Sequence, residues 1–516
     1  MKNNSPRQRF LSKLINNFGS AVINGAMVFI VPRTIGPALY GNFSFLQDSF
    51  QGIIGIFDLN IGSTHFNYSS KYNNTKDATT LYFYFCLALG IILALGIVIV
   101  NWVGFSGYFW PGQKIGYICA GATLAYLMYL SVGLTNLSDS KEATVGVERR
   151  RLVVTIIGFM VLLTLFFNRV LTLATFFSLR IFVFLLAVIV FAAYLRKRNV
   201  FEFRFTKVNL NESKKVLKYL ISYSHPLVTL SLIGFFFLYF DRWFLQVISG
   251  SIFQGYYSLA FSLSSVCILF TGAMVPIFSQ MVARAHGENN KAYIQVIFQK
   301  SRMFYFLSAF LSIYFCFHTK EIIYLIGKTQ YSGAKIPLMI MLFYPIHQTY
   351  GQLCGSMLMS LERTDLTRNL GIFSLVLGFI FSYFLIAPSS FFIPGMGLGA
   401  IGLSLKMVLS QFIIVNVSLF YVCKIIDEPF VKYLSFQFLV LIPLLLIGYI
   451  SGSFYGSFFN KSFGVVGVVS QLLISGFSYI IITAVLCWFF PLLLGMKRHE
   501  LRGYVGKLLS LLKFKH

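Results

Sequence analysis

Long apolar runs recur along this sequence, and they constrain its fold more than any other feature. Each run has about 17 to 25 residues, enough for a helix to cross a hydrocarbon layer about 30 Å thick. None has the alternating pattern of a strand in a membrane β-barrel. With 57% hydrophobic and 11% charged residues, the composition also differs strongly from that of soluble domains. We therefore predict an all-α integral membrane protein.

Polar breaks divide the sequence into about fourteen predicted transmembrane helices. Their approximate ranges are 14–33, 41–62, 79–102, 115–137, 151–167, 171–195, 219–247, 254–281, 301–318, 336–360, 369–387, 398–422, 432–451 and 465–490. The seventh range begins 205 residues after the first. This spacing indicates a six-helix unit that occurs twice.

A turn motif supports the same repeat. Residues Gly36 to Ser44 and Gly250 to Ser258 share the order Gly, four residues, Gly, one residue, aromatic, Ser, at an offset of 214. Because six is even, both halves enter the membrane from the same side, which predicts two parallel lobes. The expected divisions are an N-terminal lobe, a basic cytoplasmic loop, a C-terminal lobe, and a helix pair with a basic tail, at 1–198, 199–216, 217–425 and 426–516.

Basic residues are distributed unevenly between the two sides of the predicted bundle. With the N-terminus inside, and with basic residues at the ends of spans counted with the adjoining side, 32 of the 42 Lys and Arg lie on the inner side and 7 on the outer side, and the other three lie deeper within spans. The positive-inside rule therefore predicts cytoplasmic N- and C-termini. This distribution also explains the net charge of +26 without a nucleic-acid partner.

Two cations are predicted near the membrane midplane. At a rise of about 1.5 Å per residue, Arg180 lies about 14 Å into the sixth span and Lys406 about 12 Å into the twelfth. A charge in hydrocarbon costs about 2.5 kcal/mol or more, so such residues usually face a cavity or a partner. Since the two spans are equivalent in the two lobes, we expect both cations to face a central cleft. A cation bonded to helix carbonyls is the alternative.

Further polar residues fall within or at the ends of spans. His347, Gln348 and Gln352 form a polar patch in the tenth span, for which interhelical hydrogen bonding is the alternative. Asp48 and Asp58, in the second span, and Asp241 are candidates for charge balance or for coupling to a proton or sodium ion. For Asp48, a buried salt bridge is the alternative.

The outer ends of the first and seventh spans also carry charges. Asp241 and Arg242 lie at the outer interface and point about 100° apart on a helix, so they serve different neighbours. Arg33 has a similar position after the first span. Snorkelling interfacial side chains are the alternative interpretation.

Motifs of soluble enzymes are missing. The sequence has no P-loop for ATP hydrolysis and no Cys or His cluster for a metal, so no catalytic residue, metal or cofactor is predicted. Cations and amides in a cleft suit a large anionic amphiphile, such as a lipid diphosphate with a sugar head group. A drug cation would instead favour carboxylates.

Five short segments carry a resemblance to a known family: Ile35 to Ser44, Phe57 to Gly62, Asp241-Arg242, Gly255 to Ser258, and Pro394 to Ala400. In their order and spacing, they resemble the polysaccharide transporter family of the O-antigen flippase type. This family belongs to the multidrug/oligosaccharidyl-lipid/polysaccharide exporter superfamily. The resemblance implies a bacterial inner-membrane protein that flips undecaprenyl-diphosphate-linked sugar repeat units outward by alternating access.

Three hypotheses follow. The first is a flippase in which Arg180 and Lys406 engage the diphosphate and Arg33 and Arg242 guide release, with a polysaccharide polymerase and a chain-length protein as candidate partners. The second is an ion-coupled multidrug antiporter with the same fold. The third is a membrane-embedded glycan polymerase, which the absence of a long predicted outer loop disfavours.

Overall fold

The computed structural model describes residues 6–59, 61–71, 76–200, 234, 239–458 and 464–503. Within these ranges every regular element is a helix, as the apolar runs predict. Residues 239–264 and 498–503 are helical, and the other α-helices are α1 (Pro6–Ile35), α2 (Pro37–Phe57), α3 (Ile61–Lys71), α4 (Lys76–Trp102), α5 (Ser106–Phe109), α6 (Ile115–Ser140), α7 (Thr144–Phe167), α8 (Leu173–Lys197), α10 (Leu269–Gly287), α11 (Lys291–Gln299), α12 (Ser301–Phe317), α13 (Thr319–Gly327), α14 (Lys335–Met341), α15 (Tyr344–Ser360), α16 (Thr364–Ile386), α17 (Gly399–Ile426), α18 (Phe430–Phe458) and α19 (Gly464–Phe489).

Among the described residues, nine helices are long and apolar enough to cross a membrane, or ten if a pair bent by 69° before α13 counts as one span. Two predicted spans are broken. The span at 41–62 is split into α2 and α3 at Leu59, whose φ is 48°, and the span at 336–360 is split into α14 and α15. Most of the span at 219–247 lies outside the described residues. The chain is a multi-pass helical membrane protein.

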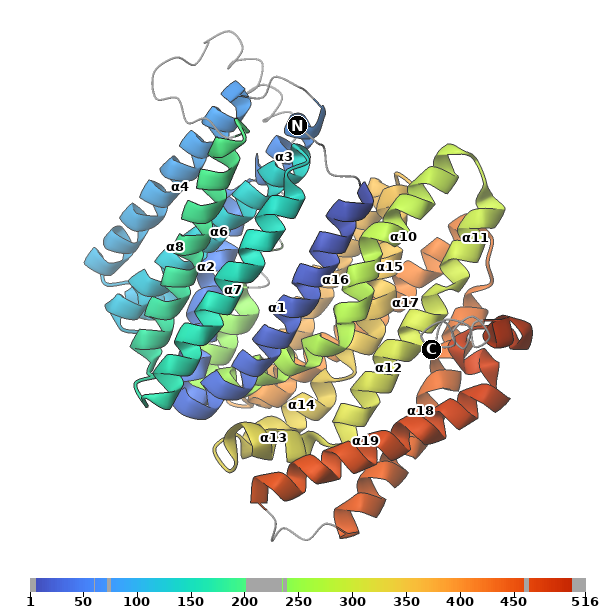
Figure 1. The fold of residues 1–516 in the computed structure, drawn as a ribbon. Helices are drawn as coiled ribbons and strands as arrows, with labels where there is room; N and C mark the ends of the chain where they lie inside the picture. Colours follow the sequence, from blue (N-terminus) through green and yellow to red (C-terminus); the bar gives the residue numbers. More distant parts are fainter. Residues whose placement is uncertain are drawn as a thin grey trace, which may run out of the picture. The chain divides into compact units, whose positions relative to one another are not determined.

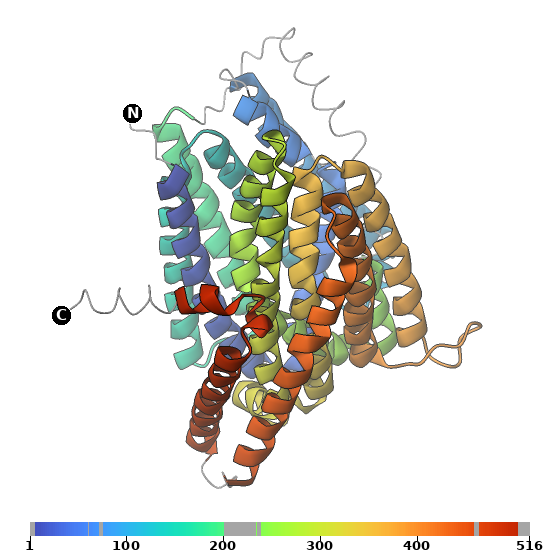
Figure 2. The ribbon, with the colours of Figure 1, turned by 90° about the vertical axis from the view of Figure 1, so that its right-hand side faces the viewer.

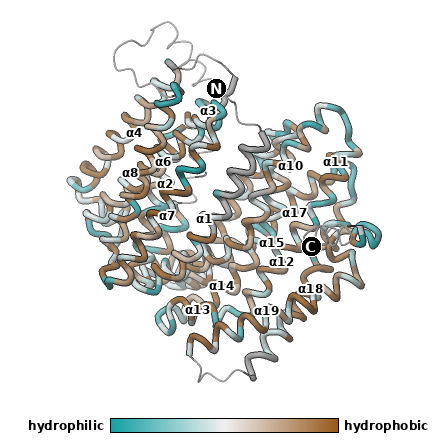
Figure 3. Tube along the Cα trace, in the orientation of Figure 1, coloured by the Kyte–Doolittle hydropathy of each residue, from teal (hydrophilic) through white to brown (hydrophobic). Residues whose placement is uncertain are grey.

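The membrane-spanning helices expose apolar side chains outward. On α4, Leu87, Leu95 and Val98 are more than half exposed, as lipid-facing side chains are. Figure 3 shows hydrophobic residues along the middle of α4 and α18 and hydrophilic ones near the ends of α4 and α10. This pattern fits helices whose middles lie in hydrocarbon.

The chain forms two compact units, each described by itself. Unit 1 consists of residues 1–258 and 382–400, and unit 2 of residues 259–381 and 401–516. Unit 1 contains parts of both predicted lobes, so the division into an N-terminal and a C-terminal lobe stays a prediction.

Unit 1 contains a bundle in which α1 packs on α7, α7 on α8, and α6 on both α8 and α2 (Figure 1). In unit 2, α12 packs on α15 and α18. Helices α18 and α19 pack as an antiparallel hairpin (Figure 2). The four helices α1, α6, α7 and α8 surround a cavity.

The first glycines of the two copies of the turn motif share a positive φ. Gly36 and Gly250 each have a φ of 80°, a left-handed conformation that favours glycine. Helix α2 begins directly after Gly36 with Pro37 in its first turn, and the helical residues 251–264 follow Gly250. The match at Gly36 and Gly250 therefore reflects two equivalent turns.

The second glycines of the two motifs pack each motif against the other. A Cβ at Gly41 would lie 2.0 Å from the carbonyl oxygen of Ser251, and a Cβ at Gly255 would lie 2.0 Å from that of Pro37. Real Cβ atoms essentially never come this close. Ser251 and Pro37 hold equivalent places in the two motifs, so the contact is reciprocal. We call it the glycine crossing.

Candidate functional site

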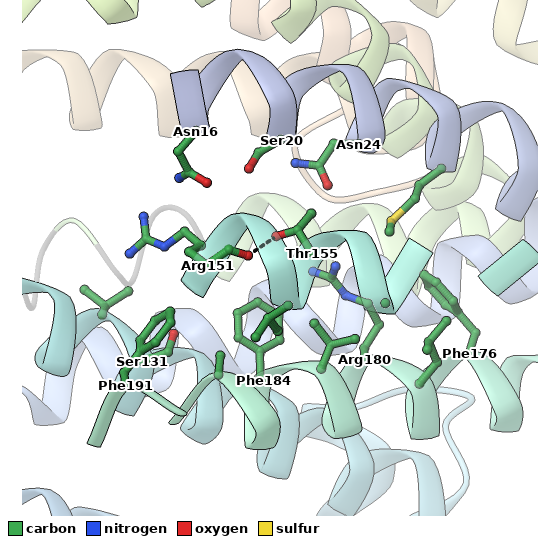
Figure 4. Close-up of a pocket in the computed structure, with 17 residues that line it drawn as sticks. Asn16, Ser20, Asn24, Ser131, Arg151, Thr155, Phe176, Arg180, Phe184 and Phe191 are labelled. Atoms are coloured by element: carbon green, nitrogen blue, oxygen red, sulfur yellow. Dashed lines mark hydrogen bonds between the residues drawn. The ribbon is translucent and has the colours of Figure 1, made fainter. Parts of the chain in front are cut away.

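A cavity of about 340 Å³ lies in unit 1 among α1, α6, α7 and α8. Its charged and polar lining consists of Asn16, Ser20, Asn24, Ser131, Arg151, Thr155 and Arg180. Apolar and aromatic side chains complete the wall, among them Phe176, Phe184 and Phe191 (Figure 4). Both charged lining residues are arginines.

The polar side of α1 faces this cavity. Asn16, Ser20 and Asn24 are spaced four residues apart, so they lie along one face of the helix. In Figure 4 the three side chains extend from α1 toward Arg151 and Thr155 of α7 and Arg180 of α8. Amides and a hydroxyl therefore lie opposite the two guanidinium groups.

Arg180 is positioned by a capped helix. Thr172 caps the N-terminus of α8, and a reciprocal hydrogen-bond pair with Thr175 fixes the start of the helix. Two turns later Arg180 extends toward α1, with its guanidinium on the side of Asn24 and Thr155 (Figure 4). Its guanidinium carbon lies 5.1 Å from the ring centre of Phe184, and its Nε has no hydrogen-bond partner among the described residues. This cation has donor capacity for an anionic ligand.

Arg151 has protein partners instead. Its Nη2 donates to the hydroxyl of Thr135 at 2.5 Å, and its Nη1 lies 3.5 Å from Oε1 of Glu148. Oε2 of Glu148 accepts a hydrogen bond of 2.7 Å from the amide of Asn16. Glu148 is 3% exposed, so a buried carboxylate links α1 to Arg151. With two arginines against this one carboxylate, the described side chains give the cavity a positive balance.

Lys406 lies in unit 2. It is buried on α17, and its Cε would be 3.1 Å from a Cβ at Gly378 of α16, so this glycine leaves room for the lysine. Because Arg180 and Lys406 belong to different units, their meeting across a cleft stays a prediction.

The predicted polar patch of the tenth span lies on α15 in unit 2. His347 is buried with its ring 5.0 Å from that of Phe412, and Gln348 accepts a hydrogen bond from the amide of Gln411. Oε1 of Gln352 is buried without a hydrogen-bond partner among the described residues. The patch joins α15 to α17, in keeping with interhelical hydrogen bonding, and its role in binding stays a prediction.

Charged residues near the glycine crossing pair with each other. Nη2 of Arg242 lies 2.7 Å from Oδ2 of Asp48 on α2, and its Nη1 donates to Ser258 at 3.0 Å. Asp241 instead accepts a hydrogen bond from Ser382. The adjacent residues thus serve different neighbours, as their helical offset predicts.

We expect Asp48→Asn to weaken this connection between α2 and the helical residues 239–264. Asp48 is 35% exposed and Arg242 15%, so the pair is partly screened, and about 1 kcal/mol of coupling is expected. A double-mutant cycle with Arg242→Gln, read by thermal unfolding in detergent, measures it. Additive effects of the two substitutions would contradict the prediction.

The remaining two predicted residues lie elsewhere in unit 1. Arg33 is exposed in the last turn of α1. Asp58 follows α2 and accepts hydrogen bonds from the hydroxyl of Tyr129 at 2.6 Å and from the backbone of Gly62 at 3.2 Å. Neither lines the cavity.

Sequence reasoning missed Asn16, Asn24, Glu148 and Arg151. The predicted fifth span begins at 151, where the apolar run begins, but α7 already begins at Thr144. Glu148 and Arg151 therefore fall at or before the start of the predicted span, although both lie within α7. The spacing of Asn16, Ser20 and Asn24 was the available signal for a polar face on α1.

Several solved transporter structures are similar to this chain. The chain is similar to the lipid II flippase MurJ in an inward closed conformation, with 12% identity, a TM-score of 0.65, and coverage of 92% of this chain and 98% of that chain. It is also similar to a multidrug resistance MATE family transporter of the MOP superfamily in an inward-facing conformation, with 14% identity, a TM-score of 0.62, and coverage of 79% and 94%. A third similar structure is a MOP superfamily transporter from Pyrococcus furiosus, described as having a binding pocket of reverse polarity, with 14% identity, a TM-score of 0.50, and coverage of 81% and 93%.

At these identities the similarity shows the fold alone, which is the fold of these transporters. No curated protein sequence matches the chain. A family model described as "Polysaccharide biosynthesis protein" matches residues 10–282, more than half of the 516 residues. The chain therefore belongs to the polysaccharide biosynthesis protein family.

Proposed function

We propose that this protein is a flippase that moves an undecaprenyl-diphosphate-linked oligosaccharide from the cytoplasmic to the outer leaflet. The substrate is an O-antigen, capsule or exopolysaccharide repeat unit. The observation that carries the proposal is the cavity of unit 1, where Arg151 and Arg180 are the charged lining residues and Asn16, Ser20 and Asn24 lie opposite.

The chemistry of the cavity favours an anion. Guanidinium groups bind phosphate oxygens with charge-assisted, often bidentate hydrogen bonds, and amides and hydroxyls suit sugar hydroxyls. The family description concerns polysaccharide biosynthesis, and the similar MurJ structure is a lipid II flippase. Both support a lipid-linked glycan as the substrate.

The proposed architecture has fourteen spans in two parallel six-helix lobes, at 1–198 and 217–425, joined by the loop 199–216 and followed by the pair at 426–516. The reciprocal contact of Gly41 and Gly255 supports the parallel repeat, since equivalent residues make equivalent contacts. In a bacterial inner membrane, both termini would be cytoplasmic. Alternating access would then open the cavity to each side in turn.

Several residues take further roles in this proposal. Lys406 would provide a second midplane cation, and the patch of His347, Gln348 and Gln352 would contact sugar. Arg33 and Arg242 would guide release at the outer end. A proton or sodium ion would couple through Asp48, Asp58 or Asp241.

An ion-coupled multidrug antiporter is the second candidate, favoured by the similarity to MATE family transporters. The two functions differ in the charge of the substrate. Purified protein that transports a cationic dye but binds no diphosphate would establish the antiporter.

The test of the flippase is deletion of the gene in its host, followed by labelling of sugar with a probe that reaches only the outer leaflet. The proposal expects the lipid-linked glycan to accumulate in the inner leaflet. Single unpolymerised units in the outer leaflet would point to a polymerase instead. An unchanged glycan would reject the flippase and lead to drug-efflux assays.

A further inference from the structure

The carboxylate of Glu148 competes with any ligand for Arg151. Glu148 lies one helical turn before Arg151 on α7, and its Oε1 is 3.5 Å from Nη1 of that arginine. Arg151 lines the cavity, whereas Glu148 is buried, is not among the lining residues, and accepts a hydrogen bond of 2.7 Å from the amide of Asn16 on α1. An acidic group thus sits at the arginine where a substrate phosphate would bind.

The pairing of Glu148 with Arg151 is loose. Charge-assisted N–H···O bonds are usually about 2.7–2.9 Å long, and the separation here is 3.5 Å. The hydrogen bond from Asn16 to the other oxygen of Glu148 is short by comparison. Glu148 therefore keeps a partner on α1 when Arg151 turns away, and an exchange of anions leaves no buried carboxylate without a hydrogen bond.

Arg151 also has a second anchor. Its Nη2 donates to Thr135 on α6, so the guanidinium stays at the edge of the cavity when its contact with Glu148 is lost. A guanidinium has five N–H donors, enough to hold Thr135 and one phosphate together. Figure 4 shows Arg151 and Arg180 on neighbouring helices of the cavity.

We infer that Glu148 is an internal counter-anion that occupies Arg151 in the empty cavity and is displaced there by the diphosphate of the substrate. This inference rests on the proposed function, and it identifies Glu148 as a residue that sets the affinity of the cavity for its substrate. Competition by Glu148 weakens substrate binding and speeds release, because the carboxylate returns to Arg151 as the phosphate leaves.

The test is Glu148→Gln in the full chain. Glutamine keeps the size of the side chain and an oxygen for Asn16 but removes the charge that competes for Arg151. With inorganic pyrophosphate as the probe and purified protein in detergent, we expect about 5- to 10-fold tighter binding. Glycan export should fall at the same time, because release becomes slower. Glu288→Gln, at an exposed pair with Arg284, is the matched control and should change neither value.

Two outcomes would overturn the inference. If Glu148→Gln weakens pyrophosphate binding as much as Arg151→Gln does, then Glu148 only positions the arginine. Unchanged affinity would show that the carboxylate does not compete. Glu148→Asp, which keeps the charge but shortens its reach, should tighten binding by a smaller factor and serves if the glutamine variant does not fold. If neither Arg151→Gln nor Arg180→Gln affects pyrophosphate binding, the proposed site itself is wrong.

Discussion

Replacing Arg180 and Lys406 together by glutamine is expected to abolish outward delivery of the lipid-linked glycan while leaving the protein folded. Arg180 has an Nε without a hydrogen-bond partner among the described residues, which leaves donor capacity for a phosphate. Glutamine keeps polarity and much of the length of both side chains. The expected loss therefore reflects missing phosphate contacts rather than a damaged bundle.

The single variant Arg180→Gln should weaken binding of a short-chain polyprenyl diphosphate by about 10- to 100-fold. Hydrogen bonds to charged groups contribute about 1.5–3 kcal/mol, and each 1.4 kcal/mol is a factor of ten in affinity. Arg180→Lys should recover part of the loss, since it restores the charge but not the planar donor geometry.

The weaker binding is measured with the polyprenyl diphosphate and the purified Arg180→Gln protein. The loss of export is measured with the double variant in a host that lacks the gene. Arg284→Gln is the control, because Arg284 is 82% exposed, pairs with Glu288, and is not among the residues that line the cavity. Thermal unfolding shows whether the variants are folded. Normal export by the double variant would reject the assignment of both cations.

The second large effect is expected at the glycine crossing. A methyl group at Gly41 would lie 2.0 Å from a backbone carbonyl oxygen and 2.7 Å from the backbone nitrogen of Gly255, so the two backbones must separate. Forced overpacking of this kind costs about 1–3 kcal/mol. We expect Gly41→Ala to lower the free energy of unfolding by this amount and to reduce export.

Gly55→Ala is the matched control in the same helix. No atom lies within 4 Å of a Cβ at Gly55, so this substitution should be neutral or stabilise α2 by up to about 1 kcal/mol through helix propensity. Because the contact is reciprocal, Gly255→Ala should resemble Gly41→Ala. Equal stability of Gly41→Ala and Gly55→Ala would show that the crossing is not close-packed in the membrane.

Much of the fold followed from hydropathy, since long apolar runs without charges have few folded forms in lipid. Hydropathy alone placed Arg180 correctly within a helix, because apolar residues flank it on both sides. It failed at Arg151, because the first two turns of α7 are polar and resemble a loop. It also missed the break between α2 and α3, which depends on a left-handed conformation at Leu59, a residue type that rarely adopts it.

The cavity itself was beyond sequence reasoning for a different reason. Asn16, Arg151 and Arg180 come from three helices, and the way these helices pack decides which polar faces meet. Periodicity predicts a polar face on each helix but not its partner. The pairing of Glu148 with both Asn16 and Arg151 therefore needed the structure.

The cap at the start of α8 determines where the chain can tolerate insertions or deletions. Thr172 and Thr175 hold the first turn in place, and Arg180 lies eight residues beyond Thr172. Because each residue turns a helix by about 100° and advances it by about 1.5 Å, the depth and direction of this charge are set by a count of residues from the cap. Insertions or deletions between Thr175 and Arg180 would turn the guanidinium into the lipid or into a neighbouring helix, whereas the same changes in the turn before Thr172 would leave its aim intact.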